Sequence, residues 1–353
     1  MASGVDTDSL PESTTTPNFH QMRHLFSTKL YSAAVAMTLA MAAAFSSCDK
    51  KPASTSTSGI ATIVCDASFE NVLQQEIDVY EYIYPKASII PYYEDERACF
   101  DSLLNLSTKM IVASRELTDQ EQSYLKSKDR QVRQSRIAVD ALALIVNPAN
   151  NIDQMSTTEL AEILSGKETE WNNVWPNDGL GRIEVVFDHQ GSSTVQFMRD
   201  SLLNGAELGS NVFAQKSSED VFKAVAANKN AIGVIGVSWI STDMATANMS
   251  TEERAAALTD SVGSAPDQQF RKDVKVLKVS APDQVNAYAP YQYYIYTGDY
   301  PLTRSIYMIC ASAGGTISHG FYSFVTGFQG QKLIQSTGVL PNLIYTQRVE
   351  VTR

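Results

Sequence analysis

Strand-like and helix-like segments alternate along the chain after residue 59, and this alternation restricts the fold more than any other feature. Apolar runs bounded by turns predict buried strands, and apolar residues at helical spacing predict the helices between them. Strands are expected at 61–66, 87–93, 109–114, 138–148, 182–187, 231–240, 274–279 and 304–311, and helices at 70–85, 95–106, 156–166, 218–230, 319–328 and 330–338. This order indicates an α/β protein whose helices cover a sheet.

The first 48 residues are interpreted as a signal region. Basic residues precede an apolar run at 30–45 that has the length of a signal h-region. Small residues then lead to Cys48, a pattern that resembles a bacterial lipobox and implies lipidation of this cysteine. An uncleaved membrane anchor is the alternative. The start codon, Met1 or Met22, also stays open, because the residues before Met22 are atypical of a signal n-region.

A tether rich in Lys, Ser, Thr and Pro occupies 49–59, and no second apolar stretch long enough to span a bilayer follows it. The folded part is therefore expected in the cell envelope, lipid-anchored, facing the periplasm or on the cell surface. The formal net charge of -11 argues against nucleic acid as a partner. It leaves room for a small anion, because a local pocket can be positive on an acidic protein.

The cysteine and histidine content gives no metal motif. Cys65, Cys99 and Cys310 follow the signal region, and an odd number of cysteines cannot all pair within the chain. Whether Cys65 and Cys99 form a disulfide stays open. After the signal region histidine occurs only at 189 and 319, in no spacing typical of a metal site. Neither a metal nor a cofactor is predicted.

Four parts of the chain resemble the phosphate-binding proteins of bacterial ABC transporters, a family with the type II periplasmic-binding fold. The most specific is "MSTTELAEILSGKETEWNNV", with its helix, glycine and tryptophan; the others are "AIGVIGVSWI", "DYPLTRSIYMIC" with "GFQGQKLIQSTGVLP", and "VVFDHQGSSTVQF". The resemblance implies two α/β lobes with a ligand cleft between them. Residues 60–138 and 305–353 would form lobe 1, and residues 139–304 would form lobe 2.

The function implied by this resemblance is that of a binding protein, not an enzyme. It would capture inorganic phosphate between its lobes and deliver it to the permease subunits of an ABC transporter, with a lipid anchor as its only link to the membrane. No Ser/His/Asp set or phosphate-cradling P-loop supports an enzyme. The alternative is a surface signalling or interaction protein with the same fold that has lost or changed its anion binding.

The turn before the helix at 193 is the central candidate for the site. Gly191 and the hydroxyl residues Ser192, Ser193 and Thr194 either form an anion nest or simply cap the helix. Ser192 and Thr194 match the family's phosphate loop, and Ser193 replaces its glycine. Asp188 stands where the family has an arginine, so the expected cation is missing from this loop.

A replacement cation is expected from lobe 1. After the strand at 109–114 the chain reads Ser114-Arg115, at a place where the resemblance implies a ligand-binding Ser-Asp or Ser-Arg pair. Arg115 would then face Asp188 across the cleft, unless the two residues pair with each other or with their neighbours.

Two more loops complete the predicted site. Ser68 and Phe69 match the family's first loop, whose hydroxyl and backbone N–H groups bind oxygen. Arg97, before the second helix, is either a second cation or a solvated helix charge.

Overall fold

The computed structural model describes residues 54–176, 179–243, 248–259 and 268–343. The predicted signal region, the lipidation site at Cys48 and the first part of the tether lie outside these residues. Within the described ranges, no helix combines the length and the apolar character that crossing a membrane requires.

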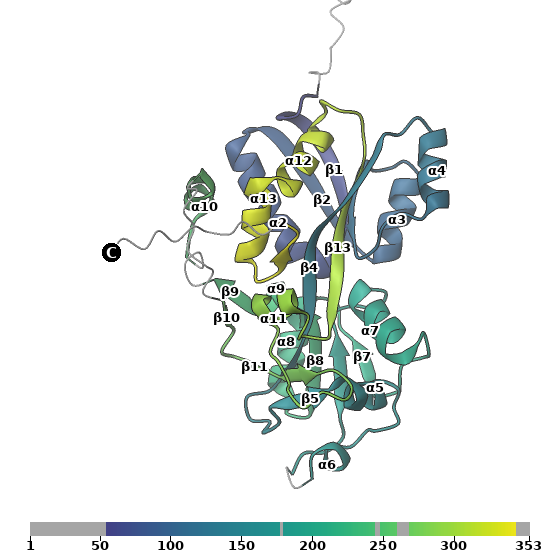
Figure 1. Cartoon of the computed structure of the whole chain (residues 1–353), viewed down its shortest axis with the longest axis vertical. Helices are drawn as coiled ribbons and strands as arrows, with labels where there is room; N and C mark the ends of the chain where they lie inside the picture. The colour runs from purple at the N-terminus through teal and green to yellow at the C-terminus, as the bar shows by residue number, and fades with distance from the viewer. Residues whose placement is uncertain (1–53, 177–178, 244–247, 260–267, 344–353) are drawn as a thin grey trace, which may run out of the picture. The chain divides into compact units, whose positions relative to one another are not determined.

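The described elements follow the predicted alternation of strands and helices (Figure 1). The strands are β1 (Ser58–Asp66), β2 (Lys86–Glu94), β3 (Met110–Ala113), β4 (Val132–Val146), β5 (Gln154–Ser156), β6 (Glu184–Phe187), β7 (Val212–Ala214), β8 (Ala231–Gly236), β9 (Ser241–Asp243), β10 (Gln268–Phe270), β11 (Lys275–Val276), β12 (Lys278–Ser280), β13 (Thr303–Ala311) and β14 (Leu340–Pro341). The helices are η1 (Ala67–Phe69), α2 (Glu70–Ile83), α3 (Glu96–Leu104), α4 (Asp119–Ser127), α5 (Thr157–Leu164), α6 (Trp171–Val174), α7 (Ser193–Leu203), α8 (Ser218–Ala227), α9 (Val237–Ile240), α10 (Thr251–Thr259), α11 (Gln292–Thr297), α12 (Ile317–Thr326) and α13 (Phe328–Ser336).

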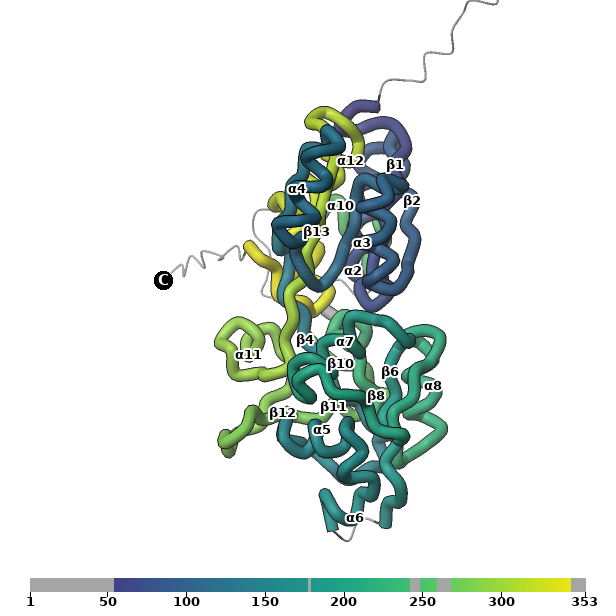
Figure 2. The backbone as a smooth tube through the Cα atoms, turned by 90° about the vertical axis from the view of Figure 1, so that its right-hand side faces the viewer, coloured from purple at the N-terminus to yellow at the C-terminus, as the bar shows by residue number. Residues whose placement is uncertain are grey.

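A long strand connects the two lobes of this α/β fold. The sheet order is β2-β1-β3-β13-β4-β8-β6-β7, with β11 and β14 also paired to β4. The first part of β4 pairs with β13, up to Ala141, and the part from Leu142 onward pairs with β8. Strand β4 therefore runs through both lobes, and β13 runs beside it (Figures 1 and 2).

Helices cover the sheet in each lobe. Helices α2, α12 and α13 lie on one face of the β1–β2 region, and α3 and α4 lie on the other side of that lobe. Helices α5, α7 and α8 surround the β6–β8 region of the second lobe. The core is formed by two clusters of buried apolar side chains, which include Trp171 and Phe321. The lobe boundaries at 138/139 and 304/305 stay a prediction.

Two predicted elements differ from the observed ones. The expected strand 231–240 ends at Gly236, and Val237–Ile240 form the short helix α9. The expected strand 274–279 is divided into β11, which pairs with β4, and β12, which pairs with β5. An apolar sequence alone does not separate a buried strand from a buried helical turn, and neither boundary has a Gly-Pro type of turn signal.

Helix α5 begins with a capping box. The Ser156 side chain accepts a hydrogen bond from the Glu159 N–H, and the Glu159 carboxylate accepts one from the Ser156 N–H. This reciprocal capping box satisfies two of the N–H groups that a helix start leaves unpaired. It therefore explains why the helix begins at Thr157.

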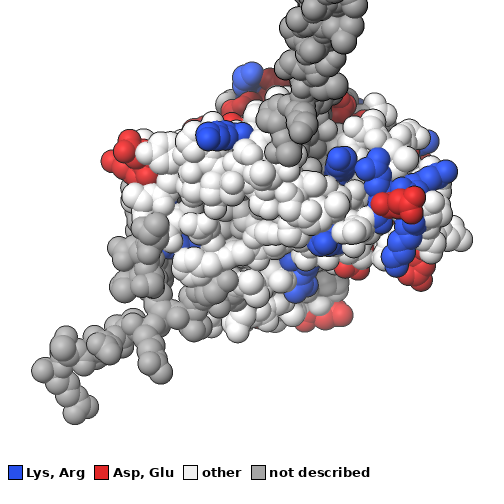
Figure 3. Space-filling view, turned by 90° about the horizontal axis from the view of Figure 1, so that it is seen from above, with Lys and Arg blue, Asp and Glu red and all other residues white. Residues whose placement is uncertain are grey.

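The three cysteines of the described chain, Cys65, Cys99 and Cys310, are buried free thiols. The disulfide left open between Cys65 and Cys99 is not formed in this structure. On the face of the described chain shown in Figure 3, basic and acidic side chains are both scattered, so this face offers nucleic acid no continuous basic surface.

Candidate functional site

Two loops, one after β1 and one after β6, meet between the lobes. The first contains Asp66 at the end of β1 and Ser68 in η1, and the second runs from Asp188 to Thr194 at the start of α7. The side chains of Asp66, Ser68 and Asp188 are at most 2 % exposed. The structure thus brings Ser68 and the 188–194 turn together.

The Asp188 carboxylate is the acceptor for most hydroxyls at this meeting point. Its Oδ2 accepts from Ser68 Oγ at 2.8 Å. Thr194 Oγ1 lies 3.4 Å from the same oxygen and 3.2 Å from Ser68 Oγ, and its one hydrogen is shared between these two acceptors. Its Oδ1 accepts from Ser192 Oγ at 2.7 Å and from the His189 N–H at 2.9 Å. Donors from both loops therefore converge on one buried carboxylate, and we call these four groups the nest.

Asp66 makes the reciprocal contact from the other loop. Its Oδ1 accepts from the Ser68 N–H at 2.8 Å, and its Oδ2 accepts from the Ser193 N–H at 3.0 Å. The second bond places a negative charge at the N-terminus of α7, where a helix stabilises anions. Each loop thus donates to a carboxylate of the other.

Ser192 caps α7 as well as contributing to the nest. Its Oγ accepts from the Val195 N–H at 3.2 Å while its hydroxyl hydrogen is donated to Asp188. A hydroxyl can do both, since it has one donor and two acceptor lone pairs. The two readings of this turn, helix cap and anion nest, are therefore compatible.

The cation of this cluster belongs to Arg304, at the start of β13. Its side chain is 2 % exposed, and its Nη1 donates to Ser193 Oγ at 2.7 Å and to Thr194 Oγ1 at 3.2 Å. Its guanidinium also lies over the ring of Phe69, with 4.5 Å from Cζ to the ring centroid. The Phe69 ring thus packs against the guanidinium and belongs to the cluster.

Arg304 is held by a buried carboxylate on the neighbouring strand. Asp140 and Arg304 are directly opposite in the β4–β13 pair, and Arg304 Nε donates to Asp140 Oδ2 at 3.0 Å. Asp140 Oδ1 accepts from the Val237 N–H at 3.3 Å. Burial raises the pKa of Asp140, and the neighbouring Arg304 opposes that rise. Nη2 of Arg304 lies 3.0 Å from the same Oδ2 but makes no hydrogen bond with the described residues.

An open cleft of about 550 Å³ adjoins the cluster. Tyr93 and Asp95 line it from one lobe, and Lys216 and Trp239 line it from the other. His189 lies at the boundary, with Nε2 3.2 Å from Asp95 Oδ1 and Nδ1 3.7 Å from Asp188 Oδ2. The cleft therefore lies beside the nest, and it meets the two loops at Ala67 and His189.

Gly191 shapes the turn beside this cleft. Its φ of 89° lies in the region that favours glycine. A Cβ at this position would come within 2.9 Å of Asp95 Oδ2. The glycine thus permits both the turn and the close approach of Asp95, which lies between β2 and α3.

The structure does not bring Arg115, Ser114 or Arg97 to the nest. The prediction of Arg115 as the cation of the site is corrected here, and of the two alternatives for Arg97 the solvated helix charge is the one observed. Arg115 is 45 % exposed and binds Glu121 with both Nη atoms, at 2.9 and 3.0 Å, because Glu121 sits one turn away in the capping box of α4. The N–H and hydroxyl of Ser114 both donate to Glu96 Oε1 at 2.6 Å. Arg97 has a 92 % exposed side chain and lies 3.7 Å from Asp101 on the same helix.

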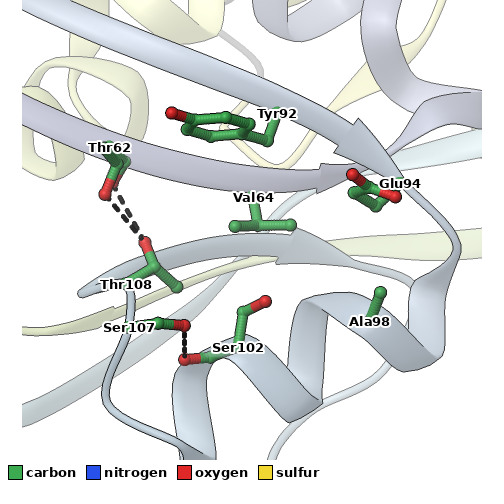
Figure 4. Close-up of a pocket in the computed structure, with 8 residues that line it drawn as sticks. All are labelled: Thr62, Val64, Tyr92, Glu94, Ala98, Ser102, Ser107 and Thr108. Carbon is green, nitrogen blue, oxygen red and sulfur yellow. Dashed lines mark hydrogen bonds between the residues drawn. The ribbon is translucent and has the colours of Figure 1, made fainter.

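A separate groove lies between α3 and the β1–β2 face, where Figure 4 shows its lining residues. Two of its hydroxyls bind backbone oxygens: Thr108 Oγ1 donates to Thr62 O and Ser107 Oγ to Ser102 O. The only charged residue among those that line it is Glu94. The groove has no cation to offer an oxyanion. No group of three His, Cys, Asp or Glu within the described ranges is arranged to hold a metal ion.

A family model described as a PBP superfamily domain matches residues 50–327, which is more than half of the chain. The chain belongs to this family. Among curated relatives, the phosphate-binding protein PstS of Staphylococcus saprophyticus is 26% identical over 143 residues, 40% of this chain and 44% of that protein. The chain thus spans less than half of the length of this relative.

Solved structures of the same two-lobed fold include two phosphate transport proteins. One, assigned as a phosphate ABC transporter substrate-binding protein of Clostridium perfringens with bound phosphate, has a TM-score of 0.60 and 20% identity, and covers 80% of this chain and 99% of its own. The other, an ABC-type phosphate transport receptor of Vibrio cholerae, has a TM-score of 0.57 and 19% identity, with 80% and 100% covered. At identities of 20% and 19%, the likeness to these two structures shows a shared fold.

Sequence reasoning missed Asp66, Asp140 and Arg304. One signal was available in the sequence. Asp140 and Arg304 lie next to the two predicted lobe boundaries, at 138/139 and 304/305, and they carry opposite charges. Asp66 precedes Ser68 in a loop that was already singled out. Asp66 ends an apolar strand, Arg304 lies near the start of one and Asp140 lies within one, and a buried charge at such a place needs a partner.

Proposed function

We propose that this protein is a lipid-anchored, non-enzymatic substrate-binding protein that captures phosphate between its lobes for an ABC transporter. One observation carries the proposal: donors from both lobes converge on the oxygens of a buried anion, here the Asp188 carboxylate. Groups that hold a carboxylate in this way have the polarity that a phosphate requires. The names of the relatives in the PBP superfamily agree with this ligand.

The cluster favours an oxyanion that carries a proton. Asp66 and Asp188 are buried where the two loops meet, so an incoming anion meets carboxylate oxygens as well as donors. Phosphate and arsenate keep a proton at neutral pH and can donate it to a carboxylate, whereas sulfate can only accept hydrogen bonds. Sulfate would bring no donor to these carboxylate oxygens, and the unpaired acceptors disfavour it relative to phosphate.

Calorimetry of the purified protein with phosphate, arsenate, sulfate and molybdate tests the function. We expect phosphate and arsenate to bind at least about tenfold more tightly than sulfate, a difference of about 1.4 kcal/mol. Small-angle scattering should show compaction when phosphate is added, since two-lobed proteins close around their ligands. If no oxyanion binds at millimolar concentration, the alternative of a surface interaction protein with altered anion binding replaces the proposal.

A further inference from the structure

We propose that the Asp188 carboxylate is an intramolecular ligand of the nest, which an incoming phosphate must displace. This inference rests on the proposed function, because it concerns the same donors. It assigns to Asp188 a competing role: the residue sets how tightly the anion binds by holding the donors that the anion needs.

The geometry of Asp188 is that of a bound anion. One of its oxygens accepts from Ser192 and the His189 N–H, and the other accepts from Ser68 and shares the Thr194 hydrogen with Ser68 Oγ. The residue is 2 % exposed. A carboxylate that is only a cap would bind the donors of its own turn, whereas this one also binds Ser68 of the opposite lobe.

The charge of the cluster disfavours a state in which phosphate and the Asp188 carboxylate occupy the nest at the same time. Asp140 binds the guanidinium of Arg304 directly, and the buried carboxylates of Asp66 and Asp188 are linked to it through Ser193 and Thr194. A buried phosphate added to this set would bring further negative charge without a new cation, which is strongly unfavourable. A phosphate monoanion that replaces the Asp188 carboxylate leaves the charge of the cluster unchanged.

The cleft beside the nest gives the displaced side chain access to solvent. The 550 Å³ cleft adjoins His189, next to Asp188, and it is lined by Lys216 and by the carboxylates of Glu70, Glu94, Asp95 and Glu219. Arg304 Nη1 lies 3.2 Å from Thr194 Oγ1, which places the guanidinium beside an anion held by that hydroxyl. Asp188 is tethered beside the nest, and a tethered competitor acts at a high effective concentration.

The test compares phosphate affinities, by calorimetry on the full chain in detergent, of the wild type, Asp188→Ala and Asp188→Asn. Removing the competitor should tighten phosphate binding by at least about tenfold in Asp188→Ala. Asp188→Asn, which keeps the shape and loses the charge, should bind with intermediate affinity. Asp153→Ala removes a carboxylate that is 81% exposed and pairs with Lys275 in lobe 2. It controls for the change in net charge, and its affinity should equal that of the wild type.

The outcomes separate this inference from the proposed function. Wild-type binding with equal or weaker binding by Asp188→Ala overturns the inference and leaves the function standing. Tighter binding by the variant than by the wild type supports both. Binding by the variant alone supports the inference and overturns the proposed function. If neither protein binds phosphate, both are wrong. Circular dichroism checks that Asp188→Ala is folded, and Asp188→Asn provides the same comparison if it is not.

Discussion

Asp140 and Arg304 face each other on the two strands that run between the lobes, and their buried pair links strand pairing to the site. Arg304 uses Nε on Asp140 and Nη1 on the hydroxyls of Ser193 and Thr194. One guanidinium thus connects the crossover strands to the start of α7. Such a pair does not guarantee stability by itself, but the loss of one partner leaves the other charge buried.

Arg304→Met should lower the free energy of unfolding by about 3–5 kcal/mol, because Asp140 is left buried without its cation. Arg115→Met is the matched control: its pair with Glu121 is half exposed, and the loss should be at most about 1 kcal/mol. Urea unfolding of both variants measures the difference. Combining Arg304→Met with Asp140→Leu should recover much of the loss. Equal losses for the two arginine variants would contradict the structural role given to Arg304.

The residues of the site were only partly predictable from the sequence. Ser68, Ser192 and Thr194 were expected at the site because of the resemblance to a known family, and they lie together in the structure. The cation could not be predicted, because Arg115 and Arg304 both lie next to predicted strands and the sequence alone does not choose between them. The choice depends on which partner each meets: Arg115 has Glu121 within its own capping loop, whereas Arg304 meets Asp140 only when β4 and β13 pair.

At the scale of elements, the segments with a clear period were predicted and the short ones were not. The helix α2 and the strands β1 and β2 agree with their predictions within a few residues. The four-residue helix α9 and the division between β11 and β12 depend on tertiary pairing, which local sequence does not encode. The turn before α7 was ambiguous because a serine hydroxyl serves as cap and as nest donor at once.

Helix α2 contains an acidic residue on its buried face. Glu76 is 1 % exposed, and neither of its oxygens has a hydrogen-bond partner within the described chain. Burial therefore raises the pKa of Glu76 well above its usual range. The folded state binds this proton more tightly than the unfolded state does. The free energy of unfolding should accordingly fall as pH rises above the unfolded pKa of about 4.3.

Glu76→Met replaces this carboxyl with an apolar side chain of similar length. We expect the free energy of unfolding to rise by about 1–3 kcal/mol at pH 8, since an unsatisfied buried group is removed. The gain should be smaller at pH 4, where the carboxyl is protonated in both states. Urea unfolding at the two pH values measures this, with Asp78→Asn on the exposed side of α2 as control. A gain that is the same at both pH values would show that Glu76 does not ionise on unfolding.

At the scale of the whole molecule, two lobes are joined by strands that pass between them. The alternation of strands and helices predicted the α/β class, and the resemblance to a known family supplied the two-lobed arrangement. What sequence could not supply was the meeting of the lobes, because Asp66 and Ser68 bind partners more than a hundred residues away. Contacts at such separations follow from the complete fold and not from any local pattern.

The position of a bound anion tests the central claim most directly. A crystal structure of the protein with phosphate should show the anion within hydrogen-bond distance of Ser68 Oγ and Thr194 Oγ1. Arg304 should be beside it and the Asp188 carboxylate turned out of the nest. An anion bound anywhere else, in the groove beside α3 or on the surface, would contradict the account. So would an anion bound at the nest with Asp188 still holding all of its present hydrogen bonds.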